Sequence, residues 1–378
     1  MLRQLKIYRK AAELPESWNS TAGTQNILLT REYLSALEDS LPNNMDCFFA
    51  GFFLNDELIG GALFQYLDFR RHSTFRKDEV SYGIRNFLIR KVSRNIMILG
   101  NNMLTGQNGF HFDLSRISLD EAVSWLSEAA QRIQKEAGRT SIIIFKDYKP
   151  DFAAFFKQDI YRHYHHFSVQ PNMILHLRPE WCSFGDYLND LSKKYRGRAK
   201  TAKKKLEGIR AEELDLQQVR NLRTRMNELY LHVAENAPFN TFFLADNHFE
   251  SMKEHLDDNF RILGYFSGDE LIGFCTLILN RADIDTYFLG YDKDLQKSRQ
   301  LYLNMLLDMV EFGIRQRCKR IIFGRTALEI KSTIGAVPVE IVGLIRHNHP
   351  VVNLFMKNVF SSVSPKMEWI QRNPFKED

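Results

Sequence analysis

The segment FGRTALEIKSTIGA, residues 323–336, gathers polar side chains directly behind a short apolar run. That run, RIIF at 320–323, has the composition of a buried strand and ends at Gly324. In an α/β sheet, residues just beyond the C-terminal end of a strand commonly line the ligand crevice. The segment is therefore a candidate site. Its polar members include Arg325, Thr326, Glu329, Lys331 and Ser332.

The same segment also has a purely structural interpretation. Thr326 and Glu329 have the spacing of a capping box, with Thr326 as the N-cap and Glu329 at N3. Under that interpretation Glu329 begins a short helix and carries no chemistry. The sequence alone leaves both interpretations open.

Familiar catalytic and metal-binding motifs are missing from the chain. It contains no G-x-x-x-x-G-K-[ST], no G-x-G-x-x-G after a strand, no G-x-S-x-G and no H-E-x-x-H. The densest histidine cluster, RHYHH at 162–166, alternates as strand ligands would but has no acidic or cysteine partner nearby. We expect it to be a polar strand edge and expect no metal. The cysteines are widely spaced and are expected to be reduced thiols. They are Cys47, Cys182, Cys275 and Cys318.

Length and composition set the scale of the fold. With 378 residues and 44% hydrophobic content, the chain is long enough for two domains. We place them at 1–170 and 171–378. The net charge of +5 is too small to indicate nucleic-acid binding by itself. The N-terminus lacks the apolar core of a secretory signal, and no stretch approaches the roughly 20 apolar residues of a membrane span. We expect a cytoplasmic protein that could still contact a membrane peripherally.

A short repeat divides the sequence into comparable halves. Residues 51–60 read GFFLNDELIG and residues 264–273 read GYFSGDELIG, identical at seven of ten positions. In both copies an apolar strand enters a turn at Asp56 or Asp269, and a second strand leaves through Leu-Ile-Gly. Each copy therefore predicts a β-hairpin, and the two should occupy equivalent places in similarly folded halves. A chance match of a common hairpin sequence is the alternative.

The order of elements after each hairpin strengthens the duplication. An extended segment, a helix and a short strand are expected at 95–100, 119–136 and 141–145, and again at 283–291, 301–316 and 320–323. Antiparallel strands followed by β-α-β produce a mixed sheet flanked by helices. The predicted class is α/β (α+β), with two mixed, mostly antiparallel sheets.

A strongly basic segment opens the second domain. In residues 183–208 apolar side chains recur at three- and four-residue steps, which predicts a helix with Ser183 as its N-cap. Lysines and arginines occupy the other faces. This surface either keeps a linking helix soluble or binds phosphates of a nucleotide, a tRNA or anionic lipid. The candidate phosphate or partner contacts are Lys203, Lys204 and Lys205.

Three features together resemble the FemAB-like branch of the GNAT acyltransferase superfamily. They are GRTALEIKSTIGA at 324–336, YFLGYDKDLQKSRQLYLNMLLDMVEFGI at 287–314, and the basic helix before the second hairpin. The resemblance covers most of 170–360 and is mainly one of order over 1–150. It implies two tandem GNAT-like domains, with the active site in the second. It also implies transfer of an acyl or aminoacyl group to an amine.

The donor is where the sequence departs from the family pattern. GNAT enzymes that use acyl-CoA usually hold its pyrophosphate with a Q/R-x-x-G-x-G/A loop. Here QKSRQL at 296–301 keeps the leading Gln296 but neither glycine. Glycine permits close approach of backbone amides to phosphate, so an acyl-CoA donor would depend on side chains such as Lys297 and Arg299. Aminoacyl-tRNA is the alternative donor, for which a basic helix would be useful.

The implied reaction gives roles to individual residues. Attack of an amine on an ester or thioester needs proton removal, orientation and oxyanion stabilisation. Glu329 would be the base or would hold the amine, and Tyr287 or Tyr291 would protonate the leaving group. Arg325, Lys331 and Ser332 would bind substrate. The acceptor would be a small-molecule, cell-wall-precursor or lipid-linked amine. There are two rival interpretations. One is a non-catalytic module that binds an anion or nucleic acid, and the other is a peripheral membrane acyltransferase that acts on a lipid-linked amine.

Overall fold

The chain alternates between two structural units. The computed structural model describes residues 2–69, 94–138, 140–168, 170–237, 240–356 and 369–376. Unit 1 comprises Met1–Gln170, Pro238–His248 and Glu340–Lys366, and unit 2 comprises Pro171–Ala237, Phe249–Val339 and Met367–Asp378. The chain therefore passes between the units at 170/171, 237/238, 248/249, 339/340 and 366/367.

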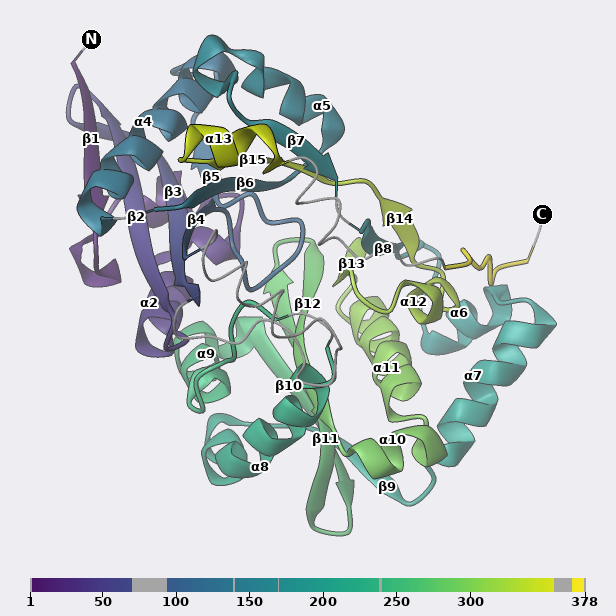
Figure 1. Cartoon of the computed structure of the whole chain (residues 1–378). Coiled ribbons are helices and arrows are strands. Elements are labelled where there is room, and N and C mark those ends of the chain that lie inside the picture. Colours follow the sequence, from purple (N-terminus) through teal and green to yellow (C-terminus); the bar gives the residue numbers. More distant parts are fainter. Residues whose placement is uncertain are drawn as a thin grey trace. The chain divides into compact units, whose positions relative to one another are not determined.

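Unit 1 is built on a mixed sheet with the strand order β1-β2-β3-β4-β6-β15-β7 (Figure 1). Its strands are β1 (Arg3–Tyr8), β2 (Met45–Leu54), β3 (Glu57–Asp68), β4 (Asn95–Leu99), β6 (Ile142–Tyr148), β7 (His165–Ser168) and β15 (Val342–His347). The short β5 (Phe110–Phe112) also pairs with β3. Among these strands β4 and β6 run parallel, and the other neighbours run antiparallel.

Unit 2 repeats this plan with the order β9-β10-β11-β12-β13-β8-β14. Its strands are β8 (Asn172–His176), β9 (Ile209–Glu213), β10 (Phe260–Ser267), β11 (Glu270–Asn280), β12 (Asp283–Tyr291), β13 (Arg320–Gly324) and β14 (Val337–Val339). The parallel pair is β12 and β13, at the place that β4 and β6 hold in unit 1. The predicted fold class and the tandem organisation are confirmed.

In each sheet, the strand next to the last comes from a distant part of the sequence. β15 follows β14 along the chain but lies in unit 1 between β6 and β7, whereas β8 follows β7 but lies in unit 2 between β13 and β14. The order of elements in the sequence therefore does not match their order in the sheets. β7 is the terminal strand of its sheet, and of the histidine cluster at 162–166 only His165 and His166 lie on this edge strand.

The predicted pair of equivalent hairpins is confirmed by their registers. β2 pairs with β3 and β10 pairs with β11, and Asp56 and Asp269 are the second residues of the two turns. The pairing slips by one residue at the same position in both copies, after Phe52 and after Tyr265, and this leaves one isoleucine of each LIG triplet without a cross-strand partner. The repeated sequence therefore encodes a repeated β-bulge.

Helices cover the sheets and complete two separate cores. Unit 1 has α1 (Trp18–Thr21), α2 (Arg31–Asp39), α4 (Leu119–Ala137), α5 (Pro150–Ala153) and α13 (Pro350–Leu354). Unit 2 has α6 (Phe184–Asp190), α7 (Lys193–Lys205), α8 (Leu216–Ala234), α10 (Lys293–Arg299), α11 (Leu301–Arg315) and α12 (Leu328–Ser332), while α9 (His248–Leu256) starts at the 248/249 crossing. The cores form where α4 packs on the first sheet and where α7 and α11 pack on the second. No helix in the described ranges has the length and apolarity to cross a bilayer.

The single helix expected at 183–208 is two helices. Ser183 does cap the first, in a capping box with Asp186. At Leu191 the backbone is extended (φ −67°, ψ 141°), and Leu191 pairs with Phe375 while the Ser192 amide donates to the Pro374 carbonyl. A backbone contact with the C-terminal segment thus replaces one helical turn, which the apolar periodicity could not reveal.

Close packing of α8 on β12 leads to a stability prediction. A Cβ added at Gly290 would lie 2.5 Å from the Tyr230 amide nitrogen, so Gly290→Ala should lower the free energy of unfolding by about 1–3 kcal/mol or more. Gly197 in α7 is the matched control, since nothing lies within 4 Å of its added Cβ. Gly197→Ala should raise the free energy of unfolding by about 0.5–1 kcal/mol. Urea unfolding compares the two, and equal effects would contradict the described contact.

Candidate active site in unit 2

The candidate segment leaves β13 through a strained turn. Gly324 has φ 75°, a left-handed conformation that favours glycine. Arg325 follows, half-buried, and makes no hydrogen bond or ion pair with the residues that the structure describes. A guanidinium without a counter-ion at the end of a strand is suited to binding an anion.

The expected capping box is absent from this segment. α12 begins after Ala327, which has a left-handed backbone (φ 51°, ψ 48°) and caps no amide with its side chain. That turn takes Thr326 out of capping position, so the prediction of Thr326 as N-cap is wrong. The spacing of Thr326 and Glu329 satisfied the pattern, but the backbone turned one residue later than the pattern assumes.

Lys331 is the buried cation of the site. Its side chain lies on α12 and the residue is 3% exposed. Nζ donates to the Phe323 carbonyl at 2.5 Å and lies 3.5 Å from the Gly324 carbonyl oxygen, at the C-terminal end of β13. Because burial disfavours the charged form, the pKa of Lys331 falls from 10.5 to about 7. Near neutral pH this amine therefore exists in both protonation states.

Glu329, placed in the sequence as base or amine holder, is occupied by the C-terminal segment. Its carboxylate accepts from Nε of Arg372 at 3.1 Å and also from a terminal nitrogen of that guanidinium. The Arg372 amide donates to Oγ of Ser332, and the Phe375 ring lies against Gly335. The tail 369–376 thus holds α12 in place. No motif in the tail signals this contact, and sequence reasoning missed it.

The parallel strands that frame the site pair over a short distance. β12 and β13 are joined from Asp283–Asp285 to Arg320–Ile322, and β12 then runs on for six residues to Tyr291. A bulge at Tyr287 and Phe288 bends β12 here, and Oγ1 of Thr276 donates to the Phe288 carbonyl at 2.6 Å. The two strands therefore separate toward the edge of the sheet where Arg325 and Lys331 lie.

The two candidate tyrosines of β12 point to opposite faces of the sheet. Tyr287 packs edge-on against Phe288, whose ring meets Tyr230 of α8. Tyr291 lies 6.4 Å from Tyr302 of α11, and burial raises its pKa. Only one of the two can face a substrate bound on the α11 side. The packing singles out Tyr291 as the tyrosine on that side.

The donor-binding candidates lie on α10, which follows β12 at the same edge of the sheet. Lys297 is exposed, and Gln296 and Arg299 are half-buried. Gln300, at the α10–α11 junction, has a left-handed backbone (φ 50°, ψ 43°), the conformation that a glycine would adopt at low cost. α11 then begins without a side-chain cap. The left-handed turn therefore falls between positions 299 and 301, where the loop pattern would have its two glycines.

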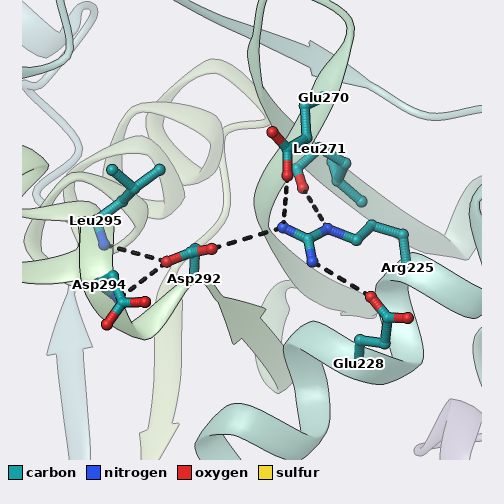
Figure 2. Close-up of polar contacts among 7 residues, drawn as sticks. All are labelled: Arg225, Glu228, Glu270, Leu271, Asp292, Asp294 and Leu295. Carbon is teal, nitrogen blue, oxygen red and sulfur yellow. Dashed lines mark hydrogen bonds and ion pairs between the residues drawn. The ribbon is translucent and has the colours of Figure 1, made fainter.

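Asp292 fixes the start of α10. Its carboxylate accepts from the amides of Asp294 (2.9 Å) and Leu295 (3.2 Å), as drawn in Figure 2. The same carboxylate faces the guanidinium of Arg225 from α8 at 3.6 Å. The N-cap of α10 is thus shared with an ion pair to another helix.

The equivalent place in unit 1 is filled by the chain itself. β4 and β5 together take the position of β12, and the loop 100–109 runs between them. Lys146 of β6 donates to the carbonyls of Asn101 and Leu104, both at 2.8 Å, and Asp147 accepts from the Gly106 amide at 3.0 Å. The end of β6 is therefore covered by a loop with its own hydrogen bonds, whereas unit 2 has no such loop after β12.

The three candidate lysines of the basic helix α7 differ in whether they have a partner or face solvent. Lys203 forms an ion pair with Asp308 of α11, which also accepts from the Tyr265 hydroxyl at 2.7 Å. Lys204 and Lys205 are exposed. Lys203 therefore joins α7 to α11, while Lys204 and Lys205 face solvent.

The structure thus brings some candidates together and separates others. Arg325, Glu329, Lys331 and Ser332 share the segment after β13, and α10 follows β12 at the same edge. Within the described ranges no group of three or more His, Cys, Asp or Glu side chains is arranged to hold a metal ion, and the four cysteines are unpaired.

Comparisons with known proteins place the fold. No family model matches the sequence. No curated protein matches it either. Among solved structures the chain is similar to FemX, with 12% identity and a TM-score of 0.56 over 97% of this chain and 100% of FemX. The chain therefore shares the fold of FemX, in agreement with the sequence resemblance.

Two further solved structures are more distant. The C-terminal domain of a putative lysylphosphatidylglycerol synthetase from Agrobacterium fabrum has 8% identity and a TM-score of 0.49 over 83% of this chain and 88% of that one. A tandem GNAT protein from the clavulanic acid biosynthesis pathway has 10% identity and a TM-score of 0.49, covering 84% and 87%.

Burial of Lys331 predicts a pH-dependent stability. The pKa is lowered in the folded state, so between about pH 7 and 10.5 the unfolded chain binds more protons than the folded one. The free energy of unfolding should therefore rise with pH in this window, by up to about 1.4 kcal/mol per unit from this group. Lys331→Met should remove that contribution. Urea unfolding at pH 7 and pH 9 tests it, and an unchanged slope in the variant would count against the burial.

The lysines of α7 give a second stability prediction. Lys203→Gln breaks a partly buried pair and should lower the melting temperature, because Asp308 loses its cation. The double variant Lys204→Gln, Lys205→Gln removes exposed charges and should leave melting within experimental error. Calorimetry compares them. If both variants melt alike, the Lys203–Asp308 pair does not stabilise the α7–α11 contact.

Proposed function

We propose that the chain transfers an acyl or aminoacyl group to an amine at the C-terminal ends of β12 and β13 in unit 2. The observation that carries the proposal is Lys331, a buried amine held by strand carbonyls where the two parallel strands separate. A buried group with a strongly shifted pKa at a strand end is a functional-site candidate. The fold shared with FemX supports the same class of reaction.

The reaction needs a group that supplies both charge and a proton. The acceptor nitrogen attacks the carbonyl carbon of an ester or thioester, a C–N bond forms, and the carbonyl oxygen gains negative charge. When this intermediate collapses, the C–O or C–S bond breaks and the leaving group takes a proton while the amine loses one. Protonated Lys331 stabilises the oxyanion and supplies the leaving-group proton. Its pKa of about 7 suits proton exchange at neutral pH.

Other residues of the segment hold the reactants. Arg325 binds an anionic group of the donor or acceptor, as its lack of a described counter-ion suggests. Ser332 is already bonded to the Glu329 carbonyl and to the Arg372 amide, so it supports the shape of α12. The role of Glu329 as the general base stays a prediction. Its carboxylate would have to take the proton of the amine while it accepts a hydrogen bond from Arg372. Tyr291, the tyrosine on the α11 side of the sheet, is the alternative donor of the leaving-group proton.

The donor carries phosphates in either version of the proposal. Lys297 and Arg299 of α10 supply positive charge before the uncapped start of α11, and the left-handed Gln300 turns the chain between the two helices. These features fit the pyrophosphate of acyl-CoA. Lys204 and Lys205 extend the positive surface, which fits the backbone of an aminoacyl-tRNA. A cell-wall or lipid-precursor amine remains the proposed acceptor class.

The test compares two buried lysines. Lys331→Met should lower the rate of transfer about 10²-fold or more, the usual loss when an oxyanion donor is removed. The control is Lys253→Met, because Lys253 of α9 is also buried (8% exposed) and donates to two carbonyls, those of Asp257 and Phe260. It should keep wild-type rates. Transfer is measured with acetyl-CoA and with aminoacyl-tRNA as donors and a panel of amines.

The pH dependence checks the direction of proton transfer. If the protonated amine acts, kcat should fall as pH rises through about 7, and this limb should vanish in Lys331→Met. A wild-type enzyme whose kcat rises through the same range would require the neutral amine as a base. Equal activity in the two lysine variants would show that Lys331 takes no part in the reaction. Absence of transfer by the wild-type chain with either donor would return it to a non-catalytic binding module.

A further inference from the structure

Arg225 of α8 contacts residues on three different elements. Its Nε donates to the Leu271 carbonyl at 3.0 Å, and its terminal nitrogens reach Glu270 at 2.9 Å, Glu228 at 3.2 Å and Asp292 at 3.6 Å (Figure 2). The side chain is 26% exposed. Arg225 therefore joins α8 to the start of β11 and to the end of β12.

The acidic partners of Arg225 differ in burial, and burial determines which of these ion pairs is least screened by water. Glu228 and Glu270 are 55% and 66% exposed, so water screens their pairs with the guanidinium. Asp292 is only 21% exposed, and the Leu271 carbonyl fixes the guanidinium in a defined orientation. The contact with Asp292 is thus the one that Arg225 can hold against solvent competition.

The amide and both carboxylate oxygens of Asp292 each have a partner. Its amide donates to the Ile272 carbonyl at 2.8 Å, one carboxylate oxygen caps α10, and the other faces Arg225. The Gln296 amide in turn donates to the Asp292 carbonyl. The direction in which α10 leaves the sheet is therefore set by Asp292 and its neighbours.

Unit 1 shows what the arrangement looks like without a helix-borne arginine. Asp113 matches Asp292, since its amide donates to the Ile59 carbonyl at the same distance of 2.8 Å. There Glu57 pairs with Arg116, which comes from the same loop as Asp113. The unit 1 pair closes a local loop, whereas the unit 2 pair ties the loop to α8.

We propose that Arg225 and Asp292 are a positioning pair that sets α10, and through it the place where the donor's phosphates bind. The proposal rests on the proposed function, because α10 carries Lys297 and Arg299 and leads into α11. Arg225 itself touches no reacting atom. Removing it should loosen α10 and weaken donor binding, while the chemical step at Lys331 continues once the donor is bound.

The experiment uses the full-length chain and a control on the same helix. Arg225→Ala is compared with Arg220→Ala, since Arg220 also lies on α8 and forms ion pairs, but with Glu250 and Glu254 of α9. Hydrogen exchange of the amides at 293–299 reports on α10 without any ligand. Calorimetric titrations with CoA and with deacylated tRNA report on donor binding.

Arg225→Ala should speed exchange across 293–299 at least tenfold and weaken binding of the donor probe at least tenfold, and Arg220→Ala should do neither. In transfer assays KM for the donor should rise while kcat stays within about threefold. Arg225→Lys should restore part of the binding, because it keeps the charge but loses the planar fork.

Unchanged exchange in α10, or unchanged binding despite faster exchange, would overturn the proposal. So would failure of the wild-type chain to bind either probe, since α10 would then be no phosphate site. The proposed function is judged separately by the transfer rates of the Lys331 and Lys253 variants, in which Arg225, Asp292 and α10 are unchanged.

Discussion

A single backbone hydrogen bond, made once in each unit, fixes how the candidate site is assembled. The carbonyl of the bulged isoleucine, Ile59 or Ile272, accepts from the amide of the aspartate that follows β5 or β12, Asp113 or Asp292. The bulge leaves that isoleucine without a partner on the hairpin's other strand, so its carbonyl is available to the aspartate amide. The hydrogen bond lies at the end of β5 in unit 1 and of β12 in unit 2. In unit 2 this hydrogen bond holds Asp292, which caps α10, and α10 in turn leads into α11. Because both units form the same bulge and the same hydrogen bond, the LIG triplet and its acidic turn recur together in the sequence.

Next to this frame the candidate site contains the buried amine of Lys331, whose charged form is destabilised by burial. Lys331 sits among carbonyls with no carboxylate among the described contacts, and its amine is therefore easier to deprotonate than a lysine in water. α12, which carries it, is five residues long and has no capping side chain. A helix that short cannot hold a buried cation by itself. Arg372 and Phe375 supply the missing support from the end of the described chain.

Sequence reasoning found the architecture because local patterns encode it. The hairpin repeat located β10–β11, although β10 begins four residues earlier than the repeat, and the pattern at 301–316 predicted α11 to within one residue. It could not find contacts between distant segments. Leu191 breaks the basic helix because Phe375 pairs with it, and Glu329 is held by Arg372, 43 positions away. The left-handed turns at Ala327 and Gln300 were missed for a related reason, since non-glycine residues adopt them only where the surrounding structure compensates the strain.

The placement of β15 and β8 has a consequence for synthesis on the ribosome. A nascent chain that has reached Gln170 holds β6 and β7 but lacks the strand that belongs between them, and that strand emerges only after residues 171–341 have been made. During this interval both flanking strands expose unpaired edges, which are templates for pairing with other chains. The two units therefore cannot mature one after the other. They finish together, and a ribosome that stalls in unit 2 releases an incomplete unit 1 as well.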